Sequence, residues 1–315
     1  MILPYVLIVV ALLLLFGGAE LLVKGSASLA ARAGLTPLVI GLTVVAFGTS
    51  SPELAVSLKA ALAGQGDVAV GNVVGSNVLN IAVILGLSAV ICPISVHLQL
   101  IKVDVPIMIL VSVLLPVLLS DGRLGRVEGG LLCAGIVVYT IFNVMMARKG
   151  AAAEVESEFA ESVPKSTKHW SFDLVLIGGG LATLVVGSRL LVDNSIEVAR
   201  AFQISEAVIG LTVVALGTSM PELATSIIAA VRRQPDIALG NAIGSNIFNI
   251  LATLGLSSLM VPMTAGGITL VDYAVMVGTA VLLLPFLMTG PRLGRLEGLV
   301  FLGGYCGYLA FLWPQ

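Results

Sequence analysis

Two acidic residues stand out because they lie within apolar stretches and each follows a proline. Glu53 ends the run Gly-Thr-Ser-Ser-Pro-Glu at residues 48–53, and Glu222 ends Gly-Thr-Ser-Met-Pro-Glu at 217–222. A carboxylate in apolar surroundings is unfavourable and marks a functional site unless a basic residue pairs with it. Lys59, six residues after Glu53, is the only basic candidate near either acid. We therefore interpret both acids as cation ligands, in preference to members of structural ion pairs.

The two prolines predict breaks in the helices that carry these acids. Pro52 and Pro221 lack an N–H, and their rings clash with the carbonyl four residues earlier. Those carbonyls belong to Gly48 and Gly217. Non-helical backbone within a membrane is tolerated only where it is buried in protein or lines a water-filled cavity. Freed carbonyls beside a carboxylate would suit a hard cation, whereas a kink used only for packing is the simpler alternative.

A second motif supplies neutral oxygens at helical spacing. Asn72, Ser76 and Asn80 are four residues apart, so they share one helix face, and Asn241, Ser245 and Asn249 repeat the pattern. The glycines within this motif would let helices approach closely. Helix packing alone would explain such a motif in isolation. Beside the Glu-bearing stretches we expect a mixed role, in which amides and hydroxyls supply or orient ligand oxygens.

The donor types and charge of this set favour some cations over others. Ca²⁺ takes about 6–8 oxygen ligands, and two carboxylates with two freed carbonyls could provide six. Two ionised glutamates carry a charge that one Ca²⁺, two Na⁺ or two protons would neutralise. A site that either load neutralises is suited to exchange. Mg²⁺ fits less well because it dehydrates reluctantly and demands octahedral geometry.

An internal repeat explains why these residues occur in pairs. Residues 41–55 recur at 210–224 with two differences, and residues 71–80 recur at 240–249, both at an offset of 169. The sequence therefore predicts a first half at 1–146, a polar linker at 147–169 and a second half at 170–315.

Each half contains five apolar stretches long enough to cross a bilayer. We place them at about 3–22, 37–63, 68–91, 103–119 and 127–146, and then at 173–192, 206–231, 237–260, 270–288 and 296–313. Because five is odd, the second half must enter the membrane from the opposite side, which is typical of secondary transporters. The predicted fold is an all-α polytopic membrane protein of ten helices, built as two inverted five-helix repeats with broken second and seventh helices.

Composition excludes most other classes of protein. Of the 315 residues, 58% are hydrophobic and 11% are charged, against about 25% charged in soluble domains. The formal charge of −2 gives no sign of a nucleic-acid partner. His97 and His169 fall in predicted loops and the three cysteines are isolated, so we expect no tightly bound cofactor and no enzyme.

Basic residues in the loops predict the orientation in the membrane. With the N-terminus outside, the outer loops hold three, Arg123, Arg126 and Arg200, and the inner loops hold eleven: Lys24, Arg32, Lys102, Arg148, Lys149, Lys165, Lys168, Arg232, Arg233, Arg292 and Arg295. We therefore expect both termini outside and the linker in the cytoplasm. The apolar N-terminus has no basic leader, so we interpret it as a retained first span and not as a signal peptide. We expect the protein to lie in the inner membrane of a prokaryote.

With its paired motifs, the chain resembles the sodium/calcium exchanger branch of the Ca²⁺/cation antiporter superfamily, as a compact prokaryotic member that functions as a monomer. The resemblance implies alternating access, with the first and sixth spans sliding over a fixed core. It also implies a set of ligands. Glu53 and Glu222 would bind both Ca²⁺ and Na⁺, and the Thr49 and Thr218 carbonyls would join them for Ca²⁺. The remaining ligands would form two Na⁺ sites around a central Asn80, one from Ser50, Ser76 and the Ala46 carbonyl, the other from Ser219, Ser245 and the Ala215 carbonyl.

One position departs from the family pattern and leaves the counter-ion open. Asn249 stands where these exchangers often carry Asp, so a proton-coupled Ca²⁺ antiporter of the same fold is the first alternative to Na⁺ coupling. A passive cation channel is a second alternative, which the paired inverted motifs argue against. An intramembrane enzyme is the least favoured, because no histidine lies within a predicted span.

Overall fold

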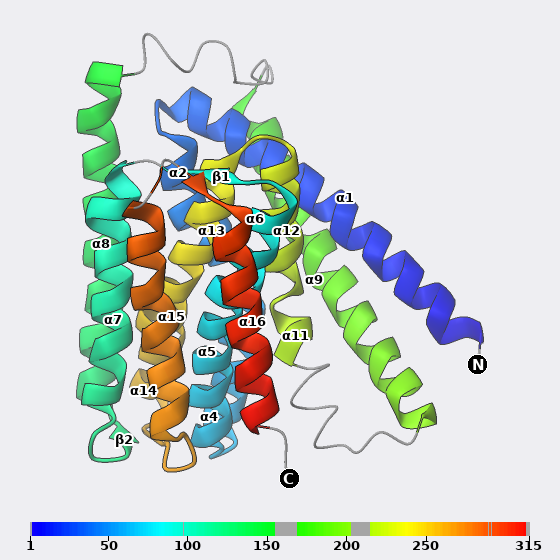
Figure 1. Ribbon diagram of the computed structural model, residues 1–315, viewed down its shortest axis with the longest axis vertical. Coiled ribbons are helices and arrows are strands. Elements are labelled where there is room, and N and C mark those ends of the chain that lie inside the picture. The colour runs from blue at the N-terminus through cyan, green and yellow to red at the C-terminus, as the bar shows by residue number, and fades with distance from the viewer. Residues whose placement is uncertain are drawn as a thin grey trace.

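The computed structural model shows a protein that is almost entirely helical (Figure 1). It describes residues 2–96, 98–154, 169–202, 215–288, 290 and 292–312. Segments labelled η are π-helices. The first half contains α1 (Ile2–Ala33), α2 (Pro37–Ile40), η1 (Gly41–Val45), α3 (Ala46–Thr49), α4 (Ser51–Leu62), α5 (Gly66–Leu79), η2 (Asn80–Leu85), α6 (Gly86–Ile91), β1 (Ile94–Ser95), η3 (Leu100–Asp104), α7 (Val105–Leu118), β2 (Arg123–Leu124) and α8 (Arg126–Glu154). The second contains α9 (Trp170–Ala201), α11 (Ala215–Thr218), α12 (Met220–Val231), α13 (Pro235–Phe248), η5 (Asn249–Leu254), α14 (Gly255–Met260), β3 (Met263–Thr264), α15 (Leu270–Met288), β4 (Arg292–Leu293) and α16 (Arg295–Leu312).

Several helices are each long and apolar enough to cross a membrane once. Within the described residues seven qualify, and an eighth is the bent pair of 37–49 and 51–62, which turns by 45°. The expected all-α polytopic membrane fold is confirmed, while the count of ten spans remains a prediction. Two helices extend past their expected ends at residues 22 and 146. Helix α1 continues to Ala33 and α8 to Glu154, because the helix does not stop where the apolar stretch stops.

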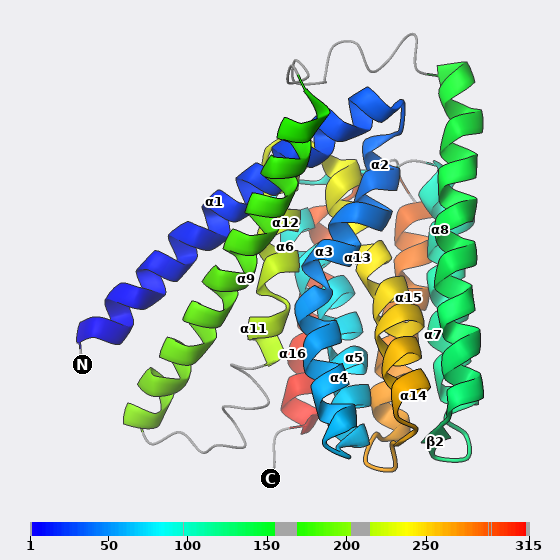
Figure 2. The same cartoon turned by 180° about the vertical axis from the view of Figure 1, so that it is seen from behind.

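Most equivalent elements of the two halves begin 169 residues apart, and some of them make reciprocal contacts. Two short antiparallel ladders join the halves: Ile94 of β1 lies opposite Leu293 of β4, and Leu124 of β2 lies opposite Met263 of β3. These two pairs exchange under the 169-residue offset. Helices α1 and α9 pack side by side and run in opposite directions along one flank of the molecule (Figures 1 and 2). Both observations support the expected inverted repeat.

The helices that carry the candidate residues form the centre of the molecule. The apolar window of the span at 235–260 is completely buried and that of the span at 66–91 is 72% buried, against 22% for the window in α8. Close approach explains this burial, because Gly240 faces the backbone of Leu38 and Leu42 with no room for a side chain. The span at 235–260 is therefore enclosed by protein and that at 66–91 is mostly enclosed, whereas α8 is largely exposed.

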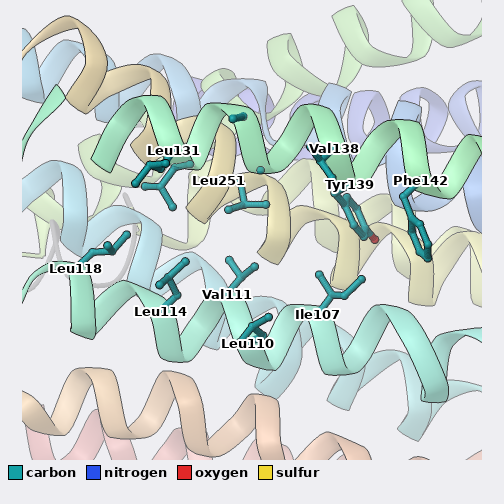
Figure 3. A pocket seen from close by; sticks show the side chains of 13 residues that line it. Ile107, Leu110, Val111, Leu114, Leu118, Leu131, Val138, Tyr139, Phe142 and Leu251 are labelled. Atoms are coloured by element: carbon teal, nitrogen blue, oxygen red, sulfur yellow. The ribbon is translucent and has the colours of Figure 1, made fainter. Parts of the chain in front are cut away.

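A buried acid ties the fourth and fifth spans together at the edge of an apolar groove. The groove lies between α7 and α8 and is lined by Leu110, Leu114 and Val138 (Figure 3). At one end Tyr139 of α8 donates a hydrogen bond of 3.0 Å from its hydroxyl to Asp104 Oδ1 at the end of η3. In the second half Tyr308, the repeat equivalent of Tyr139, donates to Asp272, which lies one residue before the equivalent of Asp104. A tyrosine–aspartate bond therefore links neighbouring spans in both halves.

Candidate cation-binding site

Both glutamates lie in the first turn of a helix that follows a break. Helix α3 ends at Thr49 and α4 begins at Ser51, with Ser50 at φ −82° and ψ 4°, outside helical values. Ser219 takes φ −88° and ψ 7° between α11 and α12. The expected interruption is present in both halves, and it places each carboxylate in the first turn of a helix. The positive end of the helix dipole there stabilises negative charge.

The two breaks are joined by reciprocal hydrogen bonds between the halves. Ser50 donates from its hydroxyl to Glu222 Oε1 at 2.9 Å, and Ser219 donates to Glu53 Oε1 at 3.2 Å. Glu53 and Glu222 are each 1% exposed. Neither forms a salt bridge within the part of the chain that the structure describes. The expectation of two buried carboxylates without a basic partner therefore holds for the described residues.

Four oxygens of this region are buried and have no hydrogen-bond donor among the described residues. They are Oε2 of Glu53, Oε2 of Glu222, Oδ1 of Asn80 and Oδ1 of Asn249. A buried polar atom without a partner is unfavourable and requires an explanation. Helix α4, which carries Glu53, packs against η5, which begins at Asn249, and α12 packs in the same way against η2. The elements that carry the four oxygens therefore meet at the contact between the two halves.

Two further asparagines hold the glutamate helices against the central spans. Asn72 Nδ2 donates to the Glu53 carbonyl at 3.3 Å and to Ser57 Oγ at 2.9 Å. Asn241 Nδ2 donates to the Glu222 carbonyl at 3.3 Å and to Ser226 Oγ at 3.0 Å. These bonds tie each glutamate helix to a central span, and the role of the motif in orienting ligand oxygens stays a prediction.

The remaining predicted residues differ in how closely they join the centre. Ser76 Oγ lies 3.5 Å from Ser219 Oγ, and Ser245 Oγ is buried without a hydrogen-bond partner among the described residues. Thr49 donates from its hydroxyl to Asn241 Oδ1 at 3.0 Å and lies 3.4 Å from the Ala46 carbonyl.

Of the predicted carbonyl ligands, that of Ala46 accepts a hydrogen bond within its own half. The Ser50 N–H donates to the Ala46 carbonyl at 3.0 Å. Thr218 lies at the end of α11, half-buried. Ala215 begins the same helix, and the structure describes its backbone only.

Residues that sequence reasoning did not single out complete the surroundings. Asn77 and Asn246 connect α5 with α13 beside Asn80 and Asn249. Ser188 of α9 donates to the Gly217 carbonyl, the carbonyl that Pro221 leaves without its helical N–H. The equivalent position in α1 is Ala19, which has no hydroxyl. The asparagines were visible in the repeated motif, whereas nothing in the sequence paired Ser188 with Gly217.

Oxygen atoms of low polarisability define the chemistry that this arrangement supports, together with a charge of −2 when both glutamates are ionised. Hard cations such as Ca²⁺ and Na⁺ prefer carboxylate, amide and hydroxyl oxygens. No group of three or more His, Cys, Asp and Glu side chains gathers in the described ranges, so the two glutamates are the only acids at the centre. One divalent or two monovalent cations would balance them.

Comparison with known proteins gives the same family along nearly the whole chain. The family model described as "Sodium/calcium exchanger protein" matches residues 3–145 and 172–313. The chain is 39% identical to the putative antiporter CaxA of Alkalimonas amylolytica over 100% of both chains. It is also 39% identical to the inner membrane protein YrbG of Escherichia coli, over 99% of this chain and 98% of that one. A solved structure of the sodium-calcium exchanger NCX_Mj superimposes with a TM-score of 0.86 at 35% identity, covering 99% of both chains.

Proposed function

This chain belongs to the sodium/calcium exchanger family, and from that premise we propose that it exchanges Ca²⁺ for Na⁺ across the membrane by alternating access at one midplane site. The observation that carries the proposal is the pair of buried glutamates, each held by a serine of the other half and each with one oxygen that has no donor among the described residues. A site of charge −2 accepts either one Ca²⁺ or two Na⁺ and is too costly to leave empty. Each load therefore displaces the other.

The proposed ligands follow the sequence expectation. Glu53 and Glu222 bind both cations, and the carbonyls of Thr49 and Thr218 join them for Ca²⁺. The Na⁺ ions use the serine hydroxyls with neighbouring oxygens: Ser50, Ser76 and Ala46 on the cytoplasmic side, Ser219, Ser245 and Ala215 on the outer side, and Asn80 and Asn249 at the centre. Because both glutamates come from one chain, a monomer suffices.

The proposed orientation places both termini outside and the segment 147–169 in the cytoplasm. In the structure α1 begins and α16 ends at one end of the molecule, while α8 ends and α9 begins at the other (Figure 1). That arrangement is compatible with the excess of basic residues predicted for the inner loops. The name of the Escherichia coli relative supports an inner-membrane location.

Counter-ion replacement in proteoliposomes tests the proposal directly. The purified chain is reconstituted into vesicles loaded with Na⁺, K⁺ or neither, and Ca²⁺ uptake is followed after dilution into Na⁺-free buffer with the membrane potential clamped. We expect uptake only from Na⁺-loaded vesicles. Uptake driven by a pH gradient without Na⁺ would select the proton-coupled alternative. Ca²⁺ flux without any counter-ion gradient would identify a channel.

Removing the hydroxyl of Ser50 or Ser219 should weaken Na⁺ binding more than Ca²⁺ binding. In Ser50→Ala, Glu222 Oε1 loses its donor and the proposed inner Na⁺ site loses a ligand; Ser219→Ala does the same for Glu53 and the outer site. We expect the Na⁺ concentration that half-saturates exchange to rise about tenfold in each variant, at the lower end of losses seen for groups that orient metal ligands. Ser51→Ala is the matched control, because its hydroxyl donates to the Phe47 carbonyl at an exposed position. Equal effects in all three variants would contradict the assignment.

A further inference from the structure

Four asparagines form a closed set of hydrogen bonds between α5–η2 and α13–η5. Asn77 Nδ2 donates to the Asn246 carbonyl and Asn246 Nδ2 donates to the Asn77 carbonyl, both at 3.2 Å. Asn80 Nδ2 then donates to Asn246 Oδ1 at 2.9 Å, and Asn249 Nδ2 donates to Asn77 Oδ1 at 3.1 Å. Asn77, Asn80 and Asn249 are at most 1% exposed, as is Asn246. We call this set the asparagine ring.

The backbone fixes which way each amide of the ring points. A main-chain carbonyl can only accept, so the side chain of Asn77 must turn its nitrogen toward the Asn246 carbonyl. Its oxygen then faces position 249 and requires a donor there. Asn249 must therefore turn its nitrogen to Asn77, which leaves its own oxygen on the opposite side. The same reasoning, with the halves exchanged, runs from Asn246 to Asn80.

The oxygens released by this ordering are the ones that lack a partner at the centre. Oδ1 of Asn80 and Oδ1 of Asn249 are both buried without a donor among the described residues, as are Oε2 of Glu53 and Oε2 of Glu222. Each of the two asparagines begins a π-helix, and π-helical turns often occur at functional sites. The ring therefore commits the amide nitrogens of Asn80 and Asn249 to the other half and leaves their two oxygens without a donor among the described residues.

We propose that Asn77 and Asn246 are positioning residues for cation binding, which orient the amide oxygens of Asn249 and Asn80 toward the cation and keep the site at a charge of −2. This inference rests on the proposed function, since it concerns the same site. Asn77 and Asn246 do not touch the cation; each acts through the asparagine of the other half.

The ring also explains why position 249 carries an amide in this chain. A carboxylate there would turn an acceptor toward Asn77 Oδ1, which the Asn246 carbonyl prevents from rotating away. Two acceptors facing each other in a buried site repel, so an acid at position 249 would fit there only in its protonated, neutral form. Asn77 thus excludes a third negative charge from the centre.

Ca²⁺ binding to the purified full chain, measured by calorimetry in nanodiscs, tests the ring through double-mutant cycles. We expect N77A to weaken Ca²⁺ binding by about 10- to 100-fold, the range for residues that orient metal ligands. N77A combined with N249A should lose no more Ca²⁺ affinity than N249A alone, because Asn77 acts through Asn249. The losses of affinity in N77A and N80A should instead be additive. N246A should show the reverse pattern, coupling with N80A and adding with N249A.

A matched control separates positioning from stability. Asn143 is fully buried in α8, and its amide donates to the Tyr139 carbonyl away from the ring. N143A should lower the melting temperature and leave Ca²⁺ affinity unchanged. If N77A does not fold, N77S and the N246A cycle carry the same test.

Two different outcomes distinguish the ring from the function on which it rests. If the wild type binds Ca²⁺, two results would overturn the ring and leave the exchange proposal intact. One is an unchanged Ca²⁺ affinity in N77A, and the other is an additive loss of affinity in N77A/N249A. A wild-type protein that binds Na⁺ but no Ca²⁺ would contradict the exchange proposal, and the same cycles measured with Na⁺ would then decide the ring.

Discussion

Glu53→Gln and Glu222→Gln are each expected to abolish exchange and to weaken Ca²⁺ binding by at least about 1,000-fold. Glutamine keeps the size of the side chain and one oxygen, but it removes half of the charge at the centre. Two unit charges about 4 Å apart interact by about 4 kcal/mol at an effective dielectric of about 20, and about 1.4 kcal/mol corresponds to a tenfold change in affinity. A divalent ion at bonding distance should lose more. Ca²⁺ binding by calorimetry and Ca²⁺ uptake in Na⁺-loaded vesicles measure the two effects.

The two variants should also resemble each other. Each glutamate is held by a serine of the other half at a similar distance and is equally buried, so we expect losses of similar size. Glu128→Gln is the control, because its carboxylate accepts from the Gly125 N–H at the start of α8, far from the breaks. Exchange that survives in either central variant, or is lost equally in the control, would refute the site.

Gly244→Val should prevent the protein from folding into a stable form. A Cβ at this position would lie 2.7 Å from the Leu42 carbonyl oxygen and 2.9 Å from Ala46 Cβ. Both are held by the packing of α13 against η1 and α3, so the backbone cannot yield as a flexible side chain would. Overpacking typically costs about 1–3 kcal/mol, and we expect Gly244→Ala in that range. Valine adds two more carbons and should exceed it.

Gel filtration in detergent and thermal unfolding would measure this effect. Gly304→Val is the matched control, since no atom lies within 4 Å of a Cβ at that exposed position in α16. We expect Gly304→Val to elute and melt as the wild type does. Similar behaviour of the two variants would mean that α13 and η1 do not approach as closely as described.

Much of the centre could be predicted because the repeat marks it twice. Glu53 and Glu222 are visible as acids in apolar sequence, and Pro52 and Pro221 predict the breaks that the structure contains. These features are local in the chain, so helix chemistry determines them without knowledge of the tertiary fold.

What the sequence could not predict depends on contacts between residues that are far apart. The bond from Ser50 to Glu222 joins residues 172 positions apart, and only the opposed packing of the halves brings them together. Asn77 lies outside the face that Asn72, Ser76 and Asn80 share by their four-residue spacing, so the spacing rule overlooked it. The π-helices that begin at Asn80 and Asn249 have no sequence signature that would separate them from ordinary α-helix.

The hydroxyl of Ser188, bound to the Gly217 carbonyl, has no counterpart at Ala19 in the other half. In the proposed alternating-access cycle, identical halves would make the inward-open and outward-open forms equivalent by two-fold rotation and equal in free energy. One hydrogen bond is worth about 1 kcal/mol net, and a contact kept in only one form would favour that form about fivefold. If the chain works by the proposed alternating access, such a preference changes how long the empty or loaded protein stays open to each side. It leaves the direction of net transport to the ion gradients, because an unequal resting population supplies no driving force.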